Sequence, residues 1–215
     1  MNAPLKPLFN NIKEATAICG TLSKTSKMPG YSISLPASAC KTGQVLMKIE
    51  GSVCSDCYAC KGRYKFKNVQ DAMNKRLAGI DDPKWCAALT YLIKNSVTIG
   101  VPYFRFFDSG DIQSEAHLMK IFAVCTSCPE VQFWMPTREH KIVKNVLSKY
   151  KQPSNLVIRS SSAMIDGPAP VKGSHSSSVV SDSSYTCPAP TQGGECKDCR
   201  KCWDINVQNV AYKLH

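Results

Sequence analysis

The chain has 215 residues, enough for one sizeable hydrophobic core with an elaborated tail. Neither the opening residues, "MNAPLKPLFNNIKEATAICG", nor any later stretch has the apolar run of a signal peptide or membrane span, so we expect a soluble, cytoplasmic protein. The 27 Lys and Arg against 16 Asp and Glu give a formal net charge of +11, which favours a polyanionic partner or else marks only a solvated basic surface.

The first distinctive segment is a cysteine-rich loop over residues 40–60, which includes or adjoins two short apolar runs, "YSISLP" and "VLMKI". Cys54, Cys57 and Cys60 stand at C-x2-C-x2-C spacing, and Cys40 lies upstream in a turn-like stretch. Disulfides are rare in a reducing compartment, and thiolates three residues apart can converge on one metal centre. We therefore expect Cys54 and Cys57 to be metal ligands, with either Cys40 or Cys60 supplying the third thiolate.

A run of alternating basic and aromatic residues, "KGRYKFK", follows the last of these cysteines. Basic side chains suit phosphate contacts and aromatic rings suit base stacking, so this run is a candidate nucleic-acid surface. Its members are Lys61, Arg63, Tyr64, Lys65, Phe66 and Lys67. The alternative is the first turn of a helix whose apolar residues face inward.

Helical periodicity predicts two consecutive helices after this run. Apolar residues recur on one stripe over residues 66–80, which indicates an amphipathic helix. A second helix is expected over residues 81–95, with Asp82 as its N-cap and Pro83 at its first position.

Strands and helices alternate in the centre of the chain. Strands are expected in "PYFRFFD", "VQFWMP" and "NLVIRSS", separated by a helix from Ser114 and a helix over residues 138–150. This β-α-β-α-β order is typical of a parallel sheet in an α/β fold.

Each of these three strands ends in polar residues. Ligands of parallel α/β folds gather at the carboxyl ends of the strands, so these residues form a candidate ligand site. They are Asp108, Ser109, Gly110 and Asp111, then Thr137, Arg138 and Glu139, and finally Arg159 and Ser160. The alternative is a set of ordinary turns and helix caps.

The tail carries a second cysteine group. Cys187, Cys196, Cys199 and Cys202 lie in a short glycine- and proline-containing stretch and make a complete set of four thiolates. Either zinc or an iron–sulfur cluster would satisfy this set, and a zinc ribbon that only staples the tail is an alternative. We divide the chain into residues 1–164, an α/β unit, and residues 165–215, a Ser-rich loop and metal-binding tail packed on it.

The remaining cysteines and the histidines are assigned structural positions. Cys125 and Cys128 form a third CxxC, but Cys125 continues the apolar stripe of its helix, so we expect this pair to pack in the core. The histidines at positions 117, 140, 175 and 215 lack ligand spacing, and we expect them at the surface or at helix caps.

Four segments carry a family resemblance. "GSVCSDCYACKG", "FRFFDSGDIQS", "FWMPTRE" and "CKDCRKCW" are similar to the phage gene product 88 domain family, over about residues 28–215. The order of cysteine loop and polar strand ends also resembles the radical S-adenosylmethionine superfamily. The chain departs from that superfamily in two places: the usual cysteine spacing is C-x3-C-x2-C, and Ser109-Gly110 replaces a glycine pair.

The superfamily resemblance implies a partial (β/α) barrel that binds one or two [4Fe–4S] clusters and S-adenosylmethionine. The turn from Asp108 to Asp111 would hold the ammonium group of the cosubstrate, and Arg159 would hold its carboxylate. The other strand-end residues named above would complete this cofactor site.

These patterns together predict an iron–sulfur enzyme acting on a nucleic acid or nucleotide, placed in the host cytoplasm if a phage encodes it. A non-catalytic, zinc-stabilised module that binds DNA or RNA is an alternative. A second alternative is an iron–sulfur redox or structural protein that uses no cosubstrate.

Overall fold

The strands lie side by side in the order in which they occur along the chain. A computed structural model describes residues 8–97, 101–168, 170 and 174–214. The strands are β1 (Ser23–Lys24), β2 (Tyr31–Ile33), β3 (Tyr103–Phe106), β4 (Gln132–Thr137), β5 (Leu156–Ser161), β6 (Ser176–Val180) and β7 (Asn209–Lys213). The β1–β2 pair is antiparallel, and every later neighbouring pair is parallel. The fold is therefore mixed α/β with a mostly parallel, seven-stranded sheet.

Helices connect the early and central strands. They are α1 (Ile12–Cys19), α2 (Lys41–Leu46), α3 (Lys67–Gly79), α4 (Trp85–Ser96), α5 (Glu115–Ser127) and α6 (His140–Leu147). Short 3-10 turns cover Ala37–Ala39, Tyr58–Cys60, Gly62–Lys65, Ala189–Thr191 and Lys201–Trp203. Among the described residues, no helix combines the length and apolar character needed to cross a membrane.

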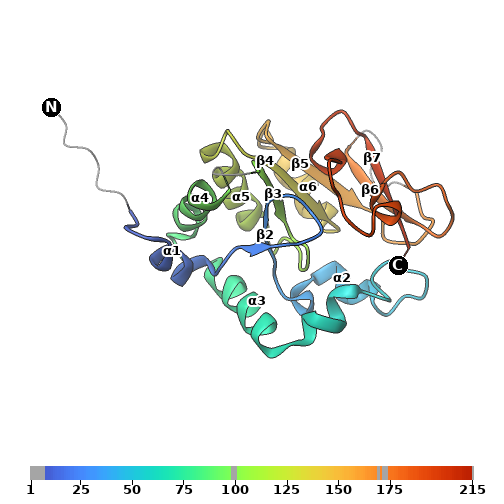
Figure 1. Cartoon of the computed structure of the whole chain (residues 1–215), viewed down its shortest axis with the longest axis horizontal. Coiled ribbons are helices and arrows are strands. Elements are labelled where there is room, and N and C mark those ends of the chain that lie inside the picture. Colours follow the sequence, from blue (N-terminus) through green and yellow to red (C-terminus); the bar gives the residue numbers. More distant parts are fainter. Residues whose placement is uncertain (1–7, 98–100, 169, 171–173, 215) are drawn as a thin grey trace.

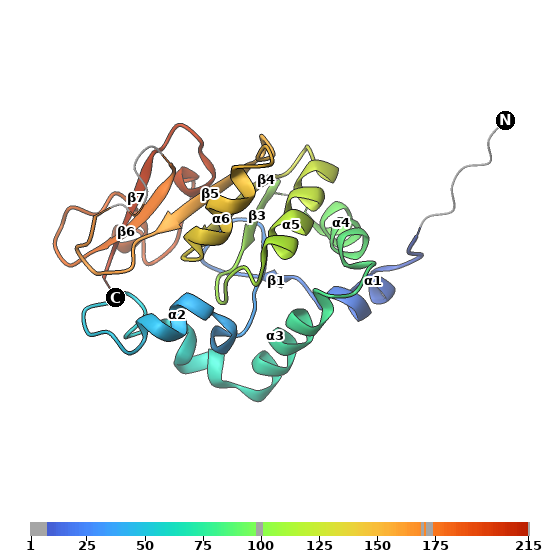
Figure 2. The same cartoon turned by 180° about the vertical axis from the view of Figure 1, so that it is seen from behind.

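The two faces of the sheet are covered by different parts of the chain. Successive side chains of a strand point to opposite faces, so Phe133 and Met135 of β4 join the main core with α4, α5 and α6, whereas Trp134 does not. Trp134 instead packs with Trp203 and Cys202 of the tail in a second cluster. Figure 2 shows α4, α5 and α6 in front of the sheet, and Figure 1 shows the tail on the opposite side.

The central β-α-β-α-β prediction is confirmed. The strands β3 and β5 fall within the expected segments, β4 extends one residue beyond its segment to Thr137, and the three strands pair in parallel. The Ser114 hydroxyl accepts the backbone N–H of His117 at 3.1 Å and caps α5, so this helix starts at the expected place. Cys125 and Cys128 are fully buried in the core, as predicted.

Several local expectations were wrong. Helix α4 begins at Trp85, and Asp82 accepts the backbone N–H of Lys84 ahead of it, so Asp82 is not the N-cap. His117 is 2 % exposed, so it does not lie at the surface, although its Nδ1 accepts the backbone N–H of Gln113 next to the start of α5; His215 lies outside the described residues.

The segment read as a Ser-rich loop contains a strand. Residues Ser176–Val180 form β6, which joins β5 to β7, so the tail completes the sheet. Ser176, Ser177 and Ser178 are buried, and the Ser177 hydroxyl donates to the Ser161 hydroxyl at 3.0 Å. Their small polar side chains pair with Ser161 of β5 and Asn209 of β7, which explains how a strand forms without an apolar pattern.

Candidate functional site

The cysteine loop lies at the carboxyl ends of β3, β4 and β5. The backbone N–H of Val53 donates to Ala163 just beyond β5, and Ser52 forms an isolated bridge with Met164. Figure 1 shows α2 and this loop below the sheet, near the C-terminus. The predicted cysteine site and the predicted strand-end site are therefore neighbours.

Two of the cysteines converge at a glycine of α2. A Cβ atom added to Gly43 would lie 3.7 Å from Cys40 Sγ and 3.8 Å from Cys54 Sγ. It would also lie 2.8 Å from Cys40 Cβ, closer than real carbon atoms approach. The missing side chain at Gly43 thus leaves room for the thiols of Cys40 and Cys54 to approach each other.

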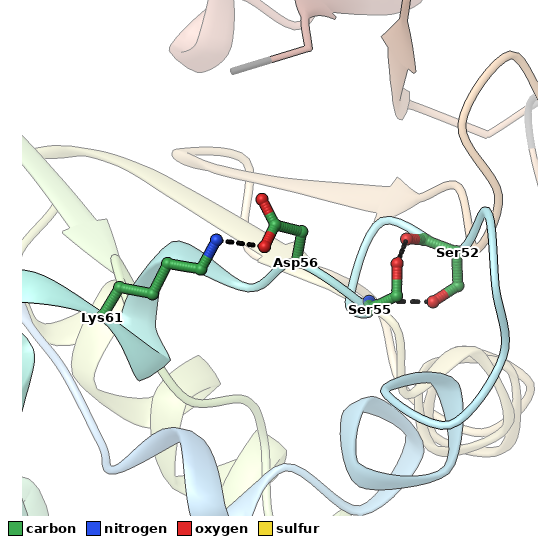
Figure 3. Close-up of polar contacts among 4 residues, drawn as sticks. All are labelled: Ser52, Ser55, Asp56 and Lys61. Atoms are coloured by element: carbon green, nitrogen blue, oxygen red, sulfur yellow. Dashed lines mark hydrogen bonds and ion pairs between the residues drawn. The ribbon is translucent and has the colours of Figure 1, made fainter.

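Short polar contacts shape the rest of the loop. The Ser55 backbone N–H donates to the Ser52 hydroxyl at 3.0 Å, and the Ser55 hydroxyl donates to the Ser52 carbonyl at 2.7 Å. Lys61 pairs with Asp56 across the segment that contains Cys57. Figure 3 shows these contacts on either side of the turn. They hold the backbone of the loop while all its thiols remain free.

The thiols of the loop act on one another electrostatically. Burial, together with the negative charges of Asp111, Cys57 and Cys54, raises the pKa of Cys40 to about 12. Burial also raises the pKa of Cys54, where the Arg138 guanidinium acts in the opposite direction. Burial and the neighbouring Cys57 raise the pKa of Cys60. The structure therefore brings all four predicted early ligands together.

The thiols do not yet stand at coordination distances. Within the described part of the chain, no group of three or more His, Cys, Asp and Glu side chains is arranged to hold a metal ion. What the structure supplies is a set of neighbouring free thiols, a donor type preferred by zinc and by iron–sulfur clusters.

Asp111 joins the ends of β3 and β4. Its carboxylate accepts the Thr137 hydroxyl at 2.5 Å and the backbone N–H groups of Ile112 at 2.8 Å and Arg138 at 2.9 Å. Burial raises the pKa of Asp111 to about 6, although these hydrogen bonds act to lower it. Most acceptor sites of this carboxylate are thus filled within the protein.

Asp108 and Glu139 are also bound internally. The Asp108 carboxylate accepts the hydroxyls of Ser32 and Tyr64 at 3.0 Å each, and that of Ser34. Glu139 accepts the backbone N–H and the hydroxyl of Thr42 at 2.8 and 2.9 Å, which ties the strand end to α2 beside Cys40. These carboxylates therefore position the cysteine loop.

The turn between Asp108 and Asp111 is closely packed. The Ser109 hydroxyl donates to the Leu35 carbonyl at 2.6 Å. Gly110 has φ of 80°, and an added Cβ would lie 2.5 Å from Leu35 Cβ, so glycine is required there.

The expectation for Arg159 needs correction. Arg159 is fully buried, and its guanidinium donates to the carbonyls of Cys202, Ser176, Val207, Lys201 and Asp204. All five N–H groups of an arginine are then engaged, so none is left for a cosubstrate carboxylate. Ser160 is buried beside it, and its backbone N–H donates to His175. Arg138 is the better candidate for binding that carboxylate. Its Nε donates to the Ser162 carbonyl, and its guanidinium lies near Cys54.

Most of the basic run is exposed, with one exception. Phe66 is 58 % exposed, and the four basic side chains of the run are exposed as well. Tyr64 points inward to Asp108 and belongs to the strand-end site. Lys61 and Lys67 form ion pairs with Asp56 and Asp71, which reduces the positive charge of the run.

The tail cysteines gather around Cys187. Burial raises the pKa values of Cys187, Cys196 and Cys202. Repulsion between neighbouring thiolates contributes in the same direction: the charge of Cys199 raises the pKa of Cys187, and the charge of Cys187 raises the pKa values of Cys196 and Cys202. The Cys202 thiol lies 3.0 Å from the Tyr212 hydroxyl. The four predicted tail ligands are therefore also neighbours.

Three contributors were missed from the sequence. Gly43 lies three residues after Cys40, and a glycine inside a helix next to a cysteine was the available signal. Thr42 and Arg105 had no distinguishing pattern, because their roles depend on contacts with distant segments.

Comparison with known proteins places the chain in a family. The family model described as Gene product 88 matches residues 6–205. No curated protein and no solved structure matches the chain.

Proposed function

The chain belongs to the gene product 88 family, and we propose that it is an iron–sulfur enzyme of the radical S-adenosylmethionine type that acts on a nucleic acid or nucleotide. One observation carries this proposal: Cys40 and Cys54 converge at Gly43, next to Cys57, over the carboxyl ends of β3 and β4. Three thiolates from one loop are the donor set of a cluster that keeps one iron open.

Cys40, Cys54 and Cys57 are the ligands we propose, with Cys60 beside them. Cys40 is preferred to Cys60 because it shares the space over Gly43 with Cys54. The glycine that leaves this space open and the free thiols around it fit a cluster. A [4Fe–4S] cluster bound there would supply single electrons for the reductive cleavage of S-adenosylmethionine.

The residues around the cysteines would orient the cosubstrate. Among the described residues, Arg138 uses its Nε for the Ser162 carbonyl, and its remaining guanidinium N–H groups lie near Cys54, where they could make a charge-assisted contact with a carboxylate. Asp111 and Glu139 hold the strand ends and α2 in register, so they act as positioning residues. The sequential strand order, with helices on one face, is also the arrangement expected of a partial barrel wall.

The basic run is the proposed contact for a polyanionic substrate. Lys61, Arg63, Lys65 and Lys67 are exposed next to the cysteine loop, and exposed Phe66 offers a stacking surface. This surface also favours the second candidate function, a nucleic-acid-binding module in which zinc replaces the cluster.

The test is anaerobic purification with measurement of iron, acid-labile sulfide and zinc, followed by electron paramagnetic resonance of the reduced protein. We expect brown protein that cleaves S-adenosylmethionine to 5′-deoxyadenosine when an external reductant is added. Cys57→Ala should lose this cluster, whereas Cys86→Ala, at a half-buried cysteine outside both groups, should keep it.

Each outcome separates the candidates. A cluster-loaded protein that neither binds nor cleaves S-adenosylmethionine would be a redox or structural protein. A colourless protein that contains only zinc would favour the nucleic-acid-binding module, and full iron content in Cys57→Ala would overturn the ligand assignment.

A further inference from the structure

Tyr58 is an exposed aromatic residue of the cysteine loop whose role is not explained by the site described above. It lies between Cys57 and Cys60, in a short 3-10 turn, and 50 % of the residue is exposed. A single exposed ring is ordinary on a protein surface. This ring, however, is held in one orientation by specific contacts at the end of the sheet.

The hydroxyl of Tyr58 is anchored at the end of β3. It donates to the backbone carbonyl of Asp108. Burial of the hydroxyl raises the pKa of Tyr58, and the charges of Arg105 and Asp108 act on it from close by. The polar end of the side chain therefore points into the protein, and the exposed half of the residue belongs to its ring and backbone.

Tyr64 supports the ring of Tyr58. The two ring centroids lie 5.7 Å apart at an interplanar angle of 62°, which is a T-shaped contact. The Tyr64 hydroxyl donates to Asp108 Oδ2 at 3.0 Å, so both tyrosines are tied to the same residue. Gln70 Nε2 of α3 donates to the Tyr64 carbonyl at 2.6 Å and fixes the backbone of this support. A side chain held in this way has little rotamer freedom to lose when a ligand binds.

Exposed cations follow Tyr58 along the chain. Lys61, Arg63 and Lys65 are exposed, and Phe66, which comes directly after them, is 58 % exposed. Two exposed rings therefore bracket three cations in this segment. Phosphates can pair with the cations while unpaired bases stack on the rings, which is the combination that binds single strands. In a duplex the faces of a base are covered by its neighbours, so stacking on a protein ring first requires the base to leave the stack.

We propose that Tyr58 is a stacking platform for an unpaired base, and that single-stranded nucleic acid is the preferred ligand of this surface. The inference rests on the polyanionic substrate proposed above and deepens it by naming the kind of strand. Because Tyr58 lies between two of the loop cysteines and reaches the end of β3, a base stacked on it would lie beside the candidate site.

The experiment uses the full chain and a single strand of about 12 nucleotides with 5-iodouracil at its centre, made both as DNA and as RNA. At one salt concentration, we expect this strand to bind at least about tenfold more tightly than the duplex of the same sequence. Excited 5-iodouracil crosslinks to an aromatic ring stacked on it, so mass spectrometry of the irradiated complex should find the crosslink at Tyr58. The tighter of the two strands identifies the sugar.

Three variants separate the ring from its anchor. Tyr58→Ala should weaken single-strand binding about 10–100-fold, the usual effect of losing one stacked base, and should leave duplex binding unchanged. Tyr58→Trp also lacks the hydroxyl but keeps an aromatic face, so its single-strand affinity should stay close to that of wild type. Tyr150→Ala removes a ring that is equally exposed, at 51 %, and is the matched control.

Three results would overturn the inference: equal affinity for strand and duplex, no crosslink at Tyr58, or binding by Tyr58→Trp as weak as that of Tyr58→Ala. In each of these cases wild-type protein still binds nucleic acid, so the proposed substrate class survives. No binding by wild type would remove both. Because the strand preference and the crosslink are measured on wild-type protein, they decide the inference even if Tyr58→Ala does not fold.

Discussion

Three arginines show why a residue type alone does not reveal its role. Arg76 donates to the Thr21 carbonyl and the Ser23 hydroxyl, both at 2.9 Å, and Arg159 donates to five carbonyls. Both therefore hold backbone segments together. Arg105 stacks over Trp134 at 4.4 Å, and Tyr58 and Asp108 stabilise its charge, so its pKa is raised although the side chain is buried. The difference lies in which groups reach each guanidinium.

Asp111→Asn should destabilise the fold. The carboxylate of Asp111 accepts hydrogen bonds through both of its oxygens, whereas an asparagine has only one accepting oxygen and an NH2 group in place of the other. At least one of the donors from Ile112, Thr137 and Arg138 would therefore lose its acceptor. We expect a loss of about 1–3 kcal/mol in the free energy of unfolding, measured by urea denaturation. Asp71→Asn, which breaks an exposed ion pair with Lys67, should change it by about 0.5 kcal/mol or less. Equal effects of the two substitutions would contradict the role of Asp111.

His117 should make stability depend on pH. Burial lowers the pKa of His117 from 6.5 to about 3, with a smaller effect of Lys120 in the same direction. The unfolded chain then binds a proton below pH 6.5 that the folded chain does not bind, so this contribution is complete above pH 6.5 and falls as the pH decreases toward 3.

The slope of this dependence can be measured. Between pH 6 and 4 the contribution should fall by about 1.4 kcal/mol per pH unit, observed as the difference between wild type and His117→Gln in urea denaturation. The variant removes the ring contacts with Trp85 and Phe107, so it will be less stable near neutral pH, and this difference should shrink as the pH falls. The same slope in both proteins would refute the assignment.

At the level of elements, the sequence predicts those whose apolar pattern decides their structure. The strands β3, β4 and β5 and the helix α5 follow continuous or periodic apolar runs. The strand β6 was missed because its buried residues are serines, which give no apolar signal. Polar pairing across strands depends on neighbours that a local pattern does not contain.

The same distinction holds for the candidate site. The cysteine groups were predicted from spacing alone, and the structure brings the members of each group together. The strand-end residues were found, but Arg159 was given a ligand role because the pattern could not show that the tail returns over the same strand. Contacts between distant segments are what sequence patterns leave undetermined.

Gly43→Ala should disturb the early site although alanine favours helices. In an exposed helix this change would stabilise by about 0.5–1 kcal/mol. Here the new Cβ would lie 2.8 Å from Cys40 Cβ and would occupy the space between two thiols. We expect a clear loss of iron per chain after anaerobic reconstitution. Gly62→Ala, where an added Cβ meets nothing within 4 Å, is the control and should retain iron despite its positive φ. Full iron content in Gly43→Ala would remove the reason for placing Cys40 among the ligands.

At the scale of the whole molecule, the sheet separates two kinds of packing. One face carries the apolar core with α4, α5 and α6, and the other carries the tail with its cysteines, Arg105 and Arg159. The early cysteine loop lies at one end of both layers, where the strands finish.

The charge of the surface gives the last prediction, that the basic run binds nucleic acid. Lys61, Arg63 and Lys65 are exposed beside Phe66, so phosphates can reach them while a base stacks on the ring. Wild-type affinity for DNA or RNA should fall steeply with salt, because each neutralised phosphate releases counterions. Changing these three residues to Glu should abolish binding, and any residual binding should show a salt slope smaller by about three. Changing the exposed Lys141, Lys144 and Lys149 to Glu alters the net charge equally and is the matched control. Similar losses in both triple variants would mean that only total charge matters, and no salt-dependent binding by wild type would leave the run a solvated surface.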